Sequence, residues 1–86
     1  HAVANQVGVI AANRVGREGA DAGAITFYGS SFICNQRGDT LAELGRADEG
    51  FVTATFDLDV LARARASMGF FRDRRPQLYG RLVEDR

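Results

Sequence analysis

The sequence contains no lysine and no tryptophan, and it has a single proline and a single cysteine. One cysteine cannot form a disulfide within the chain, which fits a reducing compartment and a cytoplasmic location. Eleven arginines balance eleven acidic residues, so no net charge would draw the chain to nucleic acid or to a membrane surface. No apolar run reaches the roughly 18 residues that a membrane span requires. These absences leave a small globular protein, or part of one.

The chain begins with His1 rather than methionine, and apolar residues follow at once. Residues 1–5 are typical of the last turn of a helix, with Asn5 near its C-terminal cap. We therefore expect the 86 residues to be a segment of a longer polypeptide. The hydrophobic fraction of 45% is high enough for a packed core.

An apolar, uncharged run that starts at Val7 ends abruptly at the polar pair Asn13 and Arg14. Such a run predicts a strand over residues 7–13 that is buried on both faces. In layered α/β folds the C-terminal ends of such strands commonly meet ligands, which makes Asn13 and Arg14 candidates for a substrate pocket. The alternative is that Asn13 only forms the turn, since asparagine is a common turn residue.

Turn signals divide the next part of the chain. Residues 14–23 hold three glycines and four charged residues, which favours a loop. The stretch 25–35 is rich in aromatic and β-branched residues, but Gly29 interrupts it, so a strand is expected over residues 31–34. A short turn and a return strand over residues 41–44 would complete a hairpin.

Residues 51–56 show the clearest strand pattern in the chain. Every second residue from Val52 to Phe56 is apolar, and these residues should share one face of a strand. A helix is predicted to follow, capped by Asp57 or Asp59, whose carboxylate would accept hydrogen bonds from free backbone N–H groups.

We expect Leu58 and Leu61 on the inward edge of this helix, and Arg63 and Arg65 nearer the solvent. The helix should end by Gly69, and the residues after it should form an irregular tail. The order of strand, hairpin, strand and helix predicts an α/β layered fold. Its sheet should be mixed, because a hairpin requires antiparallel pairing.

Four ordered strings carry a family resemblance: AANRVG at 11–16, ITFYGSSFI at 25–33, FDLD at 56–59 and GFFRDRRPQLYG at 69–80. The first three resemble the C-terminal half of the nitrilase superfamily of carbon–nitrogen hydrolases. The fourth resembles the C-terminal signature of the N-carbamoylputrescine amidases within it. The resemblance implies the C-terminal half of an α-β-β-α sandwich, with residues 1–68 as part of the hydrolase domain and 69–86 as a C-terminal tail.

The resemblance also implies that the full-length protein hydrolyses N-carbamoylputrescine to putrescine, ammonia and carbon dioxide, with no cofactor and no metal. Enzymes of this superfamily use a cysteine nucleophile, a glutamate base and a lysine that stabilises the tetrahedral intermediate. All three precede the stretch seen here, and the sequence contains no lysine, so no catalytic residue is assigned. The alternatives are another ω-amidase or carbamoyl-amide hydrolase, or a non-catalytic interaction module.

Cys34 and Glu18 each have two interpretations. Cys34 lies outside the family's nucleophile motif and follows apolar residues, so we expect a buried, inert thiol rather than a catalytic one. Glu18 is a third pocket candidate, because N-carbamoylputrescine is a cation through its distal amine, and a carboxylate at the pocket mouth would suit that amine. The alternative for Glu18 is a solvated loop charge.

The tail mixes arginine with aromatic residues, a composition that protein interfaces favour. The resemblance agrees, since nitrilase-like enzymes assemble through their outer helices and C-terminal tails, so we expect a homo-oligomer. A phosphate-binding patch is the alternative, but the zero net charge and the interleaved Asp73 argue against nucleic acid. The interface candidates are Phe70, Phe71, Arg72, Arg74, Arg75 and Tyr79.

Overall fold

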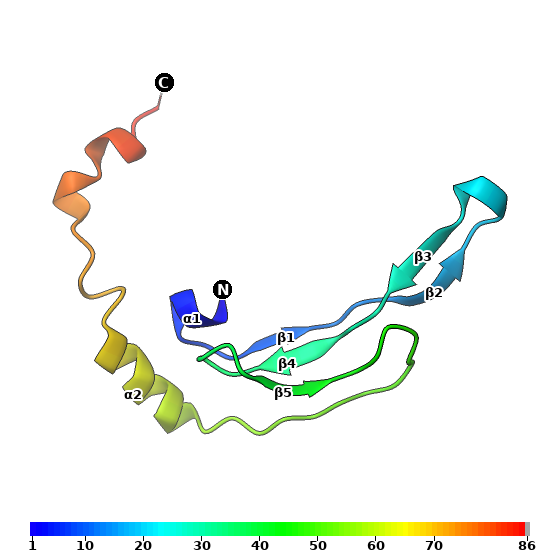
Figure 1. Cartoon of the computed structure of the whole chain (residues 1–86). Helices are drawn as coiled ribbons and strands as arrows, with labels where there is room; N and C mark the ends of the chain where they lie inside the picture. The colour runs from blue at the N-terminus through cyan, green and yellow to red at the C-terminus, as the bar shows by residue number, and fades with distance from the viewer. Residues whose placement is uncertain (86) are drawn as a thin grey trace.

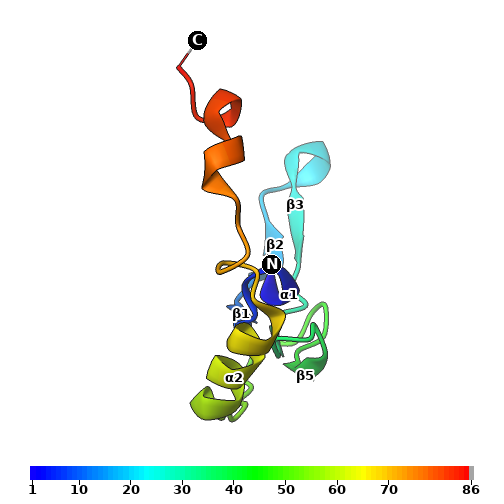
Figure 2. The same cartoon turned by 90° about the vertical axis from the view of Figure 1, so that its left-hand side faces the viewer.

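The computed structural model describes residues 1–85, which form two small antiparallel sheets, one longer helix and an extended tail (Figure 1). The chain is flat, with extents of 55 × 42 × 13 Å. The longer helix and the tail lie at one side of the sheets in Figure 1, and this side faces the viewer in Figure 2. So thin a structure buries few side chains. The buried apolar side chains in the described part are those of Ala2, Ile33, Cys34 and Leu61.

The larger sheet confirms the predicted hairpin. It has the order β1 (Val9–Ala11), β4 (Phe32–Cys34) and β5 (Thr40–Glu43), with antiparallel pairing throughout. Because β4 is the central strand, Ile33 and Cys34 have strand neighbours on both sides and are buried. The turn between β4 and β5 contains Gly38, whose positive φ is one that glycine adopts at little cost.

The prediction for the first strand was wrong in two respects. The ladder spans only Val9–Ala11, and the Ile10 side chain is 73% exposed rather than buried. The reason is that nothing among residues 1–85 covers the face of β1 to which Ile10 points. The expectation of a mixed sheet also fails for the described residues, since both sheets are antiparallel.

Part of the predicted loop over 14–23 is strand. β2 (Val15–Glu18) pairs with β3 (Ile25–Tyr28), and a three-ten turn at Asp21–Gly23 lies between them. This two-stranded hairpin projects beyond the larger sheet (Figure 1). The glycines and charged residues indicated a loop, but the hairpin accommodates both. Most of its side chains face solvent, and Gly16 takes a positive φ that glycine adopts at little cost.

The clearest predicted strand, residues 51–56, forms no ladder. Its alternation is nevertheless real: Val52, Ala54 and Phe56 are half-buried, whereas the threonines between them are exposed. The Phe56 ring packs so closely on Gly8 that a Cβ there would collide with it. The sequence pattern therefore identified the inward face, but it did not supply a neighbouring strand with which to pair.

The helix α2 (Leu58–Met68) begins and ends as predicted. The Asp57 carboxylate accepts hydrogen bonds from the N–H groups of Asp59 (2.9 Å) and Val60 (3.2 Å). Gly69 closes the helix in the left-handed conformation that glycine favours at this position. Leu61 is buried, but the prediction that Leu58 faces inward was wrong, because it is 73% exposed at the first turn.

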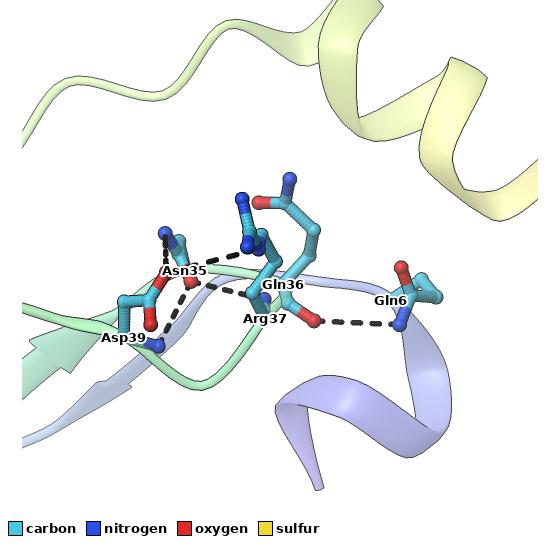
Figure 3. Close-up of polar contacts among 5 residues, drawn as sticks. All are labelled: Gln6, Asn35, Gln36, Arg37 and Asp39. Carbon is cyan, nitrogen blue, oxygen red and sulfur yellow. Dashed lines mark hydrogen bonds and ion pairs between the residues drawn. The ribbon is translucent and has the colours of Figure 1, made fainter.

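The short helix α1 spans Ala2–Asn5 and Gln6 is its C-terminal cap, so Asn5 lies next to the cap, as the sequence predicted. Gln6 has a positive φ and is the buried polar residue of the described chain. Its side-chain amide donates to the carbonyls of Val3 (2.8 Å) and Gln36 (3.4 Å), and so ties α1 to the β4–β5 turn (Figure 3). In that turn the Asn35 side chain accepts hydrogen bonds from the N–H groups of Arg37 and Asp39.

After α2 the chain leaves the sheets as an extended tail with three-ten turns at Pro76–Leu78 and Gly80–Leu82 (Figure 1). Its large apolar side chains, among them Phe71 and Leu82, are mostly exposed. None of the helices within residues 1–85 is long and apolar enough to cross a membrane.

Candidate functional site

Asn13 fixes the path of the chain where it leaves β1. Its side-chain amide donates to the Gly29 carbonyl at 2.8 Å, and its backbone N–H donates to Ser31 Oγ at 2.8 Å. The Ser31 hydroxyl is also 3.3 Å from the Asn13 carbonyl. Asn13 therefore joins the end of β1 to the link between β3 and β4. Asn13 therefore has the structural role that the sequence offered as the alternative. Its role in binding substrate stays a prediction.

Gly29 could not carry a side chain at this junction. Its φ of 58° is left-handed, and a Cβ would lie 2.7 Å from the Arg46 carbonyl oxygen and 2.7 Å from Val15 Cγ1. Its own N–H donates to the Arg14 carbonyl at 3.0 Å. The interruption that Gly29 makes in the strand pattern is thus the point at which the projecting hairpin meets the larger sheet.

Arg14 and Glu18 form an ion pair on one face of this hairpin. Arg14 Nη1 lies 2.6 Å from Glu18 Oε2, and the Arg14 guanidinium lies 4.2 Å from the centre of the Phe27 ring. The side chains of Arg14 and Glu18 are 57% and 63% exposed, so the pair contributes only about 0–1 kcal/mol to stability. A carboxylate and a guanidinium held side by side at the surface can open readily to bind a charged ligand.

Phe27 is the residue of this cluster that the sequence interpretation missed. The signal is its register: Phe27 lies opposite Gly16 in the β2–β3 ladder. Side chains that alternate along a strand place Gly16 on the same face as Arg14 and Glu18. Because glycine has no side chain, the Phe27 ring is free to lie beneath the arginine.

Cys34 is buried in β4, opposite Val9 and Thr40, as the sequence predicted. Its strand neighbours offer no imidazole or carboxylate to activate a thiol. Within residues 1–85, no three histidine, cysteine, aspartate or glutamate side chains lie close enough to hold a metal ion.

The tail candidates form a second group, apart from the hairpin (Figure 1). The Arg74 guanidinium stacks on the Phe71 ring at 3.6 Å, and its Nε donates to the Phe71 carbonyl. The Arg75 N–H donates to the Tyr79 hydroxyl at 3.0 Å. A groove of about 450 Å³ lies between these residues and the end of α1, lined by Ala4, Asn5, Gln6, Arg65, Phe70, Phe71 and Arg74.

Arg72 is occupied within its own chain. Its guanidinium donates to both carboxylate oxygens of Asp73, at 2.8 and 3.2 Å, and to the Ala66 carbonyl at 3.1 Å. The hydrogen bond between the two side chains lowers the pKa of Asp73 and raises that of Arg72. Of the three arginines among the interface candidates, Arg72 is therefore the least free to bind an anionic partner.

Comparison with known proteins identifies the family. The carbon–nitrogen hydrolase family model matches residues 1–66, and the chain belongs to this family. A solved carbon–nitrogen hydrolase from Helicobacter pylori G27 matches 98% of the chain with a TM-score of 0.82 and 41% identity, over 30% of its own length. The resemblance to the nitrilase superfamily is thus confirmed, and the fold is a part of the carbon–nitrogen hydrolase fold.

Two curated relatives share 46% identity with 96% of this chain. One is a citrullinase from Francisella tularensis and the other is an N-carbamoylputrescine amidase from Arabidopsis thaliana. A probable nitrilase from Schizosaccharomyces pombe is 36% identical over 92% of the chain. The chain spans 28–29% of the length of these three relatives.

Proposed function

We propose that the chain is the C-terminal part of an amidase that hydrolyses N-carbamoylputrescine. Water adds to the ureido carbonyl, the two carbon–nitrogen bonds break, and the products are putrescine, ammonia and carbon dioxide. The observation that supports this most directly is the 46% identity to the Arabidopsis N-carbamoylputrescine amidase, which extends over 96% of the chain. The match therefore includes both the projecting hairpin and most of the tail.

Citrulline is the second candidate substrate, because the Francisella citrullinase is equally similar to this chain. Both compounds carry a terminal ureido group on the same carbon chain, with an ammonium group at the far end. Citrulline adds one carboxylate on the carbon that bears the ammonium. The reaction at the ureido group is the same for both, so the two functions differ only in how the charged end is bound.

The catalytic groups are proposed to come from a part of the polypeptide beyond these 86 residues. The family uses a cysteine, a glutamate and a lysine, whereas this sequence has no lysine and its one cysteine is buried in β4. The segment would instead contribute part of one sheet and a wall of the substrate pocket. Asn13, Arg14 and Glu18 are the residues we propose for that wall.

The proposal is tested with the full-length protein. Ammonia release is measured from N-carbamoylputrescine and citrulline, and from N-butylurea, a neutral ureido compound of the same length. We expect hydrolysis of N-carbamoylputrescine with a kcat/KM well above that for N-butylurea, because the ammonium group adds binding energy. If the full-length protein releases no ammonia from N-carbamoylputrescine, the proposed function is wrong, and release from citrulline alone would support the second candidate.

We also propose that the tail contacts a second copy of the protein. The exposed aromatic side chains Phe70 and Phe71, and the half-exposed Tyr79, lie in a segment with little regular structure. Leaving such side chains in water forgoes about 1.5–3 kcal/mol of burial for each. Arg74 and Arg75 add planar donors that can pair with carboxylates of a neighbouring subunit.

A further inference from the structure

The ion pair on the hairpin presents opposite charges side by side. Arg14 Nη1 and Glu18 Oε2 are 2.6 Å apart, and both side chains remain more than half exposed. The Phe27 ring beneath Arg14 holds the guanidinium in place, and the Asn13 hydrogen bonds hold the chain that carries it. Binding residues are commonly found on such loops and hairpins, positioned by the sheet from which they project.

We propose that this pair recognises the charged end of the substrate: Glu18 binds its ammonium group, and Arg14 binds an α-carboxylate beside it where the substrate has one. The inference rests on the proposed function, because it concerns the ureido compounds considered there. The ureido carbon and the ammonium lie at opposite ends of these compounds. Residues that read the charge can therefore lie on the hairpin, apart from the groups that perform the hydrolysis.

The charges give the direction of the effect. A zwitterionic end complements both members of the pair, since guanidinium and carboxylate form paired hydrogen bonds and the ammonium remains for Glu18. A purely cationic end complements Glu18 alone and is repelled by Arg14. Arg14 is thus a specificity-determining residue that favours citrulline-like substrates over N-carbamoylputrescine, whereas Glu18 favours both over a neutral ureido compound.

The experiment compares kcat/KM for N-carbamoylputrescine, citrulline and N-butylurea in the full-length enzyme and three variants. Arg14→Gln should lower the value for citrulline about tenfold and leave that for N-carbamoylputrescine equal or higher. Glu18→Gln should lower both about tenfold, mainly through KM. Arg17→Gln is the matched control, because Arg17 lies on the same strand but its side chain alternates to the other face.

Hydrolysis of N-butylurea distinguishes a loss of charge recognition from general damage to the folded enzyme. Its kcat/KM should stay within about twofold of wild type in Arg17→Gln. In Arg14→Gln and Glu18→Gln it should fall less than the values for the charged compounds that each variant impairs, since N-butylurea has no charge for the pair to bind. The inference is overturned if Arg14→Gln leaves the preference between the two charged compounds unchanged, or if N-butylurea hydrolysis falls in parallel with theirs. It is also overturned if citrulline is neither a substrate nor a competitive inhibitor of the wild type. Hydrolysis of N-carbamoylputrescine in the same assay would leave the proposed function standing in each case.

Discussion

The guanidinium of Arg65 donates a hydrogen bond of 3.3 Å to the carbonyl oxygen of Gln6, and so joins residues 59 positions apart in the chain. The Gln6 side chain in turn donates to the carbonyls of Val3 and Gln36. One buried residue thereby connects α1, the β4–β5 turn and α2. These contacts hold the helix against a sheet with which it shares few buried side chains.

Gln6→Ala should destabilise the full-length protein. The substitution leaves the carbonyls of Val3 and Gln36 without their partner at part-buried positions, which costs about 1–3 kcal/mol of unfolding free energy. Asn5→Ala is the matched control, because its amide donates to the His1 carbonyl from an exposed position and should matter by less than about 0.5 kcal/mol. Urea denaturation measures both, and equal effects would contradict the role given to Gln6.

Gly29→Ala should be more damaging than any other glycine-to-alanine change in the hairpin. The new Cβ would require a left-handed backbone and would crowd the Arg46 carbonyl and Val15, at a combined cost of about 2–4 kcal/mol. Gly23→Ala is the control, because a Cβ there meets no atom within 4 Å. Thermal unfolding of both variants checks the prediction, which fails if Gly29→Ala melts with the wild type.

Asp57→Ala should lower the unfolding free energy by about 1 kcal/mol, because the N–H groups of Asp59 and Val60 lose their acceptor at the start of α2. Asp57→Asn should retain most of the stability, since asparagine caps a helix about as well as aspartate. Circular dichroism followed through urea denaturation separates the two variants. Equal losses would show that the charge of Asp57 matters rather than its cap.

Removing residues 69–86 from the full-length protein should weaken its assembly before it affects hydrolysis. The deletion removes the exposed aromatic and arginine side chains proposed to contact a second copy. Removing only residues 80–86 keeps those candidates and serves as the control. Sedimentation velocity gives the oligomeric state, and an unchanged oligomer after the longer deletion would refute the interface.

The 86 residues alone should release no ammonia from N-carbamoylputrescine. They contain no lysine, and their only cysteine is buried between neighbouring strands. Purified segment and its Cys34→Ala variant are assayed side by side against the full-length enzyme. Activity in the segment would show that the family's lysine is dispensable, and its loss in Cys34→Ala would identify Cys34 as a nucleophile.

The sequence by itself determined the features that depend on nearby residues. The turn after β4 is specified by local chemistry at Gly38. The bounds of α2 are likewise local, because its caps, Asp57 and Gly69, involve only the adjacent backbone. The four strings that identified the family are likewise local. Asn13 and Arg14 became candidates because they end an apolar run, and Glu18 because the resemblance implies a cationic substrate.

Only the tertiary structure decided which extended segments pair. A strand pattern shows which face points inward, as in residues 51–56, but a ladder also requires a neighbour at the right distance in space. The same reason explains why β2 pairs with β3 despite their glycines and charges. Ile10 is exposed because nothing among residues 1–85 covers it, which an apolar run along the chain does not reveal. The position of the Phe27 ring beneath Arg14 also depends on the tertiary structure. Cross-strand register, and not spacing along the chain, brings the two residues together.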